Sequence, residues 1–193
     1  MLNPSCRTLV VLSCTLLTGA AAASAEGADP RRGCVPGGPE YAWMQQALEG
    51  WETVSREFLR VDPAPLAPMV LFDTACAWYL APDTVGSPEI HRRTTDAGVE
   101  LAFAGGTVAV RALRHGGAVP LPGGDSVPAV ATAFAAPYRG DQASFFVMAM
   151  PSVWKREPRH AADPDLEASF QSVFAHEMTH TRQVAAVSRR IEA

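Results

Sequence analysis

Apolar and polar positions along the chain follow two different periods. Between residues 40 and 59, large apolar side chains recur at steps of three and four, with Met44, Trp51 and Phe58 on one side. This is the pattern of an amphipathic helix, and the proline-rich stretch 62–65 ends it. The sequence therefore predicts a helix over 40–59 whose apolar face packs on a core.

The middle of the chain is dense in β-forming residues. The predicted strands are 69–80, 99–103, 107–113, 129–135 and 143–150. The second and third of these are expected to form a hairpin around Gly105-Gly106. The polar stretches 83–98 and 114–128 are expected to be loops.

A second helix is predicted near the end of the chain. Asp163-Pro164-Asp165 combines an N-cap carboxylate with proline in the first turn, and nothing breaks a helix from there to about residue 186. The order helix, strands, helix is typical of an α+β domain. We therefore expect an N-terminal helix, a mixed or antiparallel sheet of about four to five strands, and a C-terminal helix packed on that sheet.

The N-terminus has the features of a secretory signal peptide. Arg7 precedes an apolar run over 8–17, and a small-x-small cleavage motif, Ala23-Ser24-Ala25, follows it. The run is too short to span a bilayer, as is every later segment, although an uncleaved anchor helix is the alternative. We expect a signal peptide over 1–25, an irregular segment over 26–39, and one domain over 40–193 in a secreted or periplasmic protein.

The four cysteines divide into two pairs. Cys6 and Cys14 lie in the predicted leader, whereas Cys34 and Cys76 remain after its removal. An even pair of cysteines in an oxidising compartment predicts a disulfide. Two free buried thiols are the alternative.

Composition excludes several classes of protein. Hydrophobic residues make up 48% of the 193 positions and charged residues 19%, which provides for a core and excludes a disordered chain. The formal net charge is −4 and basic residues are not clustered, so binding to nucleic acid is not expected.

A metal-binding motif lies inside the second predicted helix, where residues 176–180 have the sequence HEMTH. His176 and His180 are about one turn apart, so both imidazoles leave the same face and can bind one small cation. Glu177 lies about 100° further around the axis and can reach a water on that ion without binding the ion itself. Two neutral imidazoles suit Zn²⁺, which lowers the pKa of its bound water to about 7. Surface or core histidines without a ligand are the alternative.

The segment 174–183, FAHEMTHTRQ, resembles the active-site helix of zincin metallopeptidases. The resemblance implies that His176 and His180 are zinc ligands and that Glu177 is the general base and later the proton donor. In zincins an edge strand before this helix pairs with the peptide substrate, and 144–150 occupies the corresponding place here. An ordinary core strand is the alternative. The implied substrate-binding residues are Ser144, Phe145, Phe146, Val147 and Met148.

The sequence departs from the zincin pattern at the third zinc ligand. Gln183 and Ala186 stand where a metzincin-type continuation has glycine and histidine. Glu192 lies about 18 Å along the helix from His180, too far for a gluzincin-type ligand. Three explanations are open, of which we favour the first: a C-terminal subdomain of a longer protein supplies the ligand, an upstream residue supplies it, or two ligands and water bind metal weakly without catalysis. The upstream candidates are His91, His115, His160 and Asp163, and the candidates for stabilising an oxyanion are Tyr138 and Arg182.

Together these observations predict a secreted zinc-dependent hydrolase, and the resemblance specifies a metallopeptidase that acts on a peptide or protein substrate. The alternative is a non-catalytic secreted module that keeps the zincin-like shell, binds a partner, and has a structural metal or none. A third protein ligand that leaves one position open on the metal would distinguish the hydrolase from the module.

Overall fold

The computed structural model describes residues 33–80, 88–138 and 143–191, and it confirms the α+β fold. The predicted signal peptide lies outside these residues. A 20-residue helix, α1 (Gly38–Glu57), begins the fold and a 26-residue helix, α4 (Leu166–Ile191), ends it. Two short helices, α2 (Pro88–Arg93) and α3 (Pro151–Trp154), lie between them.

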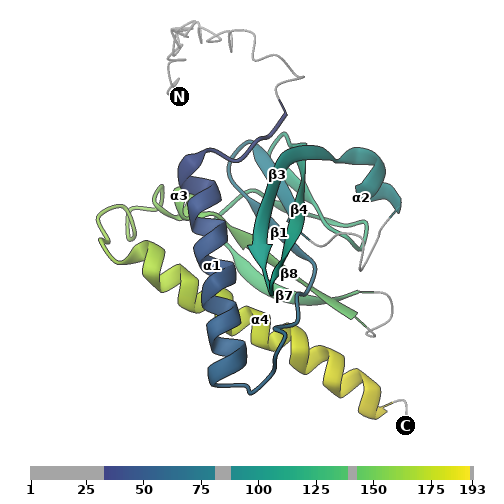
Figure 1. Cartoon of the computed structure of the whole chain (residues 1–193). Coiled ribbons are helices and arrows are strands. Elements are labelled where there is room, and N and C mark those ends of the chain that lie inside the picture. The colour runs from purple at the N-terminus through teal and green to yellow at the C-terminus, as the bar shows by residue number, and fades with distance from the viewer. Residues whose placement is uncertain (1–32, 81–87, 139–142, 192–193) are drawn as a thin grey trace, which may run out of the picture.

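A six-stranded mixed sheet forms the centre of the fold (Figure 1). Its strands are β1 (Met69–Phe72), β2 (Cys76–Leu80), β3 (Thr95–Phe103), β4 (Gly106–Arg114), β7 (Ala133–Tyr138) and β8 (Ala143–Ala149), in the spatial order β3-β4-β2-β1-β8-β7. All neighbours are antiparallel except β1 and β8, which are parallel. A separate two-stranded sheet consists of β5 (Ala118–Pro120) and β6 (Ser126–Pro128).

The sheet is covered on both faces. On one side α1 packs on β3 and on α4, and α4 packs on β7 and β8 (Figure 1). The ring of Phe174 in α4 joins these layers, because its centroid lies 6.2 Å from that of Trp43 in α1 and 5.2 Å from that of Phe146 in β8. On the opposite side a second apolar cluster includes Ile90 of α2 and Val119 of β5. The fold therefore holds α4 rigidly against the sheet.

The apolar run 69–80, predicted as one strand, is two strands joined by a turn at Asp73. The Asp73 Oδ1 accepts hydrogen bonds from the N–H groups of Ala75 and Cys76, both at 2.7 Å. The chain reverses there, and β1 pairs antiparallel with β2. The turn was missed because both strands are buried on both faces, which leaves no polar alternation to mark their ends.

We expect Asp73→Ala to lower the free energy of unfolding by about 1–3 kcal/mol, since it leaves two backbone N–H groups of a half-buried turn without their acceptor. Chemical denaturation measures the change. Thr74→Ala, at an exposed position of the same turn, is the matched control and should change stability by less than about 0.5 kcal/mol. Equal stability of the two variants would contradict this role of Asp73.

The sheet is larger than predicted, with six strands rather than four or five. The strand predicted over 99–103 begins at Thr95, and the strand predicted over 129–135 runs instead from Ala133 to Tyr138. The two predicted loops contain α2 and the β5–β6 pair. These elements have three to six residues each, too few for a periodic pattern to be visible.

The last helix begins at Leu166, later than the Asp163-Pro164-Asp165 start that the sequence predicts. The Asp163 Oδ1 accepts a hydrogen bond from the Asp165 N–H at 3.0 Å, in the turn before the helix.

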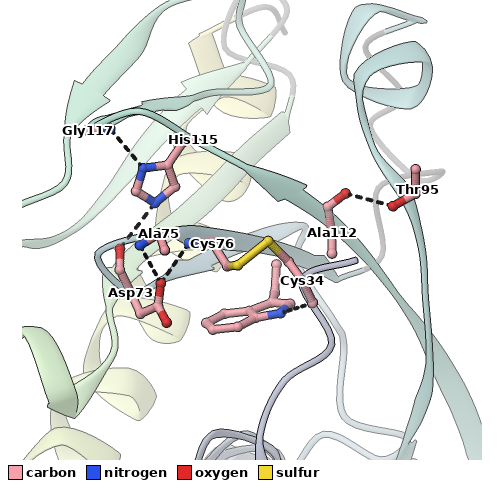
Figure 2. The surroundings of a disulfide bond; sticks show 9 residues. Cys34, Asp73, Ala75, Cys76, Thr95, Ala112, His115 and Gly117 are labelled. Carbon is pink, nitrogen blue, oxygen red and sulfur yellow. Dashed lines mark hydrogen bonds between the residues drawn. A yellow bond between two sulfur atoms is a disulfide. The ribbon is translucent and has the colours of Figure 1, made fainter. Parts of the chain in front are cut away.

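The predicted disulfide between Cys34 and Cys76 is confirmed, with a Cα–Cα separation of 5.6 Å (Figure 2). It ties the segment before α1 to the first residue of β2, and both cysteines are buried. The indole N–H of Trp78 donates to the Cys34 carbonyl at 2.7 Å and strengthens the same junction. Helix α1 is therefore attached covalently to the sheet.

Candidate metal centre

Helix α4 has a buried face and an exposed face, and the two histidines lie on the exposed one. Phe170, Phe174 and Met178 are buried against the sheet and α1. His176 is exposed and His180 is half-buried. The helical period that turns the phenylalanines inward therefore turns the imidazoles toward solvent.

The two imidazoles face each other across one helical turn. Their Nε2 atoms are 2.9 Å apart, and the ring centroids are 4.5 Å apart with an interplanar angle of 86°. Two nitrogens bound to one tetrahedral zinc at about 2.0–2.1 Å lie about 3.3 Å apart. The two nitrogens would therefore have to separate by only a few tenths of an ångström to accommodate the ion. The donor set fits two of the ligand positions of zinc.

Glu177 lies beside the histidine pair without joining it. Its side chain is half-buried, and within the described residues no third His, Cys, Asp or Glu joins the two histidines as a ligand, Glu177 included. Gln171 lies on the flank of α4 that faces α1, because its side-chain Nε2 donates a hydrogen bond to the Oε1 of Gln46 in α1 at 3.0 Å. Glu177 is about 120° around the axis from Gln171, on the opposite flank of the buried face, and β7 lies at that side of the sheet.

Among the described side chains, the structure brings none of the upstream ligand candidates to the histidine pair. The ring of His160 packs on Trp154, with centroids 5.7 Å apart, and His115 lies between the Asp73 carbonyl and Gly117 N–H near the disulfide (Figure 2). Asp163 stays in the turn before α4. The side chains of His91, Tyr138 and Glu192 lie outside the described residues. The third ligand is therefore not found in the described part of the chain.

The prediction that 144–150 forms a substrate-binding edge strand is wrong. Strand β8 lies between β1 and β7, so its backbone is paired on both sides. The proposed binding residues, Ser144, Phe145, Phe146, Val147 and Met148, are all buried. Ser144 and Phe146 support α4 instead, since Phe146 packs on Phe174 and the Ser144 hydroxyl donates to the Thr181 carbonyl at 2.7 Å. Phe145 and Val147 belong to the apolar cluster on the opposite face of the sheet. The sequence could not show this, because the parallel pairing of β8 with β1 joins segments far apart in the chain.

In the described part of the chain the sheet ends in β3 on one side and in β7 on the other, and β7 is the edge strand next to β8. The Ala149 N–H donates to the Thr132 carbonyl, so residues 132 and 149 form a hydrogen-bonded pair, and such pairs alternate along an antiparallel ladder. Ala133 and Ala135 therefore direct their N–H and C=O groups away from β8, whereas Pro137 offers only a C=O. Among the described residues, no strand pairs with this side of β7, which we call the free edge.

This edge lies next to the turn of α4 that carries the site. Pro137 is paired with Ser144, whose hydroxyl bonds to the carbonyl of Thr181, the residue after His180. Ala135 is paired with Phe146, which packs on Phe174. The free edge of β7 therefore runs alongside residues 174–181 of α4.

Gln183 is a site residue that the sequence analysis did not identify. Its Oε1 lies 2.9 Å from the Nδ1 of His180, on the side of the ring opposite the ion position. The signal that could have found it is the spacing of three residues, which places two side chains on one helical face.

Comparisons of the chain with known protein families, with curated proteins and with solved structures found no match. The described helices include none that is both long and apolar enough to cross a membrane.

Proposed function

We propose that this chain is a secreted zinc-dependent hydrolase, and specifically a metallopeptidase. The observation that carries the proposal is the pair of imidazole Nε2 atoms, 2.9 Å apart on the solvent-facing side of a helix, with a carboxylate on the adjacent flank. The predicted leader and the Cys34–Cys76 disulfide support an oxidising, extracytoplasmic compartment.

In this proposal the residues of α4 divide the chemistry between them. His176 and His180 would hold the ion, and bound zinc would supply a water whose pKa is lowered to about 7. Glu177 takes a proton from the attacking water and returns it to the leaving amine nitrogen, so one carboxylate acts first as base and then as acid. Glu177 is suited to this proton transfer because it follows His176 directly on α4 and does not form a group of metal ligands with the two histidines.

The substrate is an extended peptide that adds to the free edge of β7. Ala133 and Ala135 supply N–H and C=O groups for antiparallel or parallel pairing, and Pro137 limits the pairing at one end. A peptide bound there would pass the flank of α4 that carries Glu177.

The second candidate is a non-catalytic module that binds a partner. It is favoured by one observation, which is that the described residues provide two metal ligands and no third. Two histidines at helical spacing on the solvent-facing side of α4 also allow a closed four-histidine site between two copies of the chain, and such a site would leave no position for water.

The experiment that distinguishes the two candidates combines zinc content, mass and turnover of the mature, oxidised protein. We expect one zinc per chain, a mass in solution that does not change with zinc, and cleavage of unstructured peptides that a chelator stops. His176→Ala with His180→Ala should abolish zinc binding and cleavage. Bound zinc without cleavage would support a module with a structural metal. Absence of zinc would contradict the hydrolase and leave only a module without metal.

A further inference from the structure

We infer that Gln183 is a positioning residue that sets His180 as a metal ligand; the inference rests on the proposed function. The Oε1 atom of Gln183 lies 2.9 Å from the Nδ1 of His180, and the Nε2 of the same ring lies 2.9 Å from the Nε2 of His176. Both ring nitrogens of His180 therefore have a hydrogen-bond partner, Gln183 at Nδ1 and His176 at Nε2.

The chemistry of the amide oxygen fixes the tautomer of the neutral ring. An amide oxygen only accepts hydrogen bonds, so in a neutral His180 the Nδ1 carries the proton and the Nε2 carries the lone pair. With both rings neutral, that lone pair accepts from the Nε2–H of His176. His180 is thus already in the tautomer that binds an ion, whereas His176 must move its proton to Nδ1 before it can bind.

Holding the tautomer also holds the ring. A metal-binding imidazole that donates its other N–H to an acceptor is fixed in orientation and is a more basic ligand, and removing such an acceptor weakens metal binding by about 10–100-fold. Gln183 is exposed and follows His180 by three positions on α4, so its role does not depend on packing in the core.

The test measures metal affinity in Gln183→Ala, with Zn²⁺ and Co²⁺ in competition with a chromophoric chelator. We expect affinity to fall by about 10–100-fold. The variant should fold, because alanine is a good helix former at an exposed position. Gln183→Glu keeps an acceptor and should bind at least as tightly as the wild type. Gln171→Ala, which removes a glutamine from α4 away from the histidines, is the matched control and should leave affinity unchanged.

A second readout does not require metal. In ¹⁵N NMR of the metal-free protein, at a pH where both imidazoles are neutral, His180 should be protonated at Nδ1, and Gln183→Ala should populate both tautomers. If the wild type binds metal and Gln183→Ala binds it equally with an unchanged tautomer, the inference is overturned while the proposed function stands. If the wild type binds no metal, the proposed function fails, and the role of Gln183 in affinity fails with it.

Discussion

Glu177→Gln is expected to lower peptide hydrolysis by about 10²–10⁴-fold while the protein keeps its zinc. The amide has nearly the size of the carboxylate but cannot take a proton from water. The half-buried position of Glu177 beside the histidine pair, outside the ligand group, is the reason to expect the two properties to separate. Glutamine is also a good helix former, so α4 should be preserved.

The measurement is zinc content by elemental analysis together with initial rates on an unstructured peptide. Glu167→Gln is the matched control, because Glu167 is an exposed glutamate of the same helix that pairs with Lys155, and such surface pairs contribute little. The control should retain its full rate. Full activity of Glu177→Gln would remove the assigned role, and loss of its zinc would show that Glu177 is itself a ligand.

Removing the disulfide is expected to lower the free energy of unfolding by about 4 kcal/mol. Cys34 and Cys76 are separated by 42 residues, and closing a loop of that length constrains the unfolded chain by about this amount. The loop contains all of α1 and β1, so the bridge connects a helix on one face of the sheet to a strand at its centre. The corresponding fall in Tm is roughly 10 °C for a domain of this size.

The double variant Cys34→Ala, Cys76→Ala tests this by thermal and chemical denaturation, with the reduced wild type as a second route to the same state. Alanine is preferred to serine because both positions are buried and a hydroxyl there would need a partner. The reduced wild type and the double variant should lose similar stability. A change below about 1 kcal/mol in both would mean that the bridge does not constrain the unfolded chain as its loop length predicts.

The sequence predicted the parts of the fold that have a local signal, either a periodic pattern of apolar residues or a turn motif. The amphipathic pattern around Trp51 located α1 to within two residues at each end, and Gly105-Gly106 marked the β3–β4 hairpin. The continuous apolar run of β1 and β2 hid a turn, since residues buried on both faces give no alternation. Which strand is at the edge depends on pairings between distant segments, and no local pattern encodes them.

The candidate site also has one part that the sequence predicts and another that depends on the tertiary structure. The spacing of four residues predicted that His176 and His180 share a face, and the structure places their Nε2 atoms 2.9 Å apart. The same spacing could not predict that β7, rather than β8, is the edge strand beside the two histidines, because the edge depends on the order of the whole sheet. Gln183 was readable in principle from its spacing to His180, but its oxygen matters only once the orientation of the ring is known.

The most direct test of the central claim is a crystal structure of the mature protein with zinc, with anomalous diffraction recorded on both sides of the zinc absorption edge. The account predicts one anomalous peak on the exposed side of α4, about 2.0–2.1 Å from the Nε2 atoms of both His176 and His180, with Glu177 outside bonding distance. Absence of a peak there, or imidazoles turned to different sides of the helix, would contradict it.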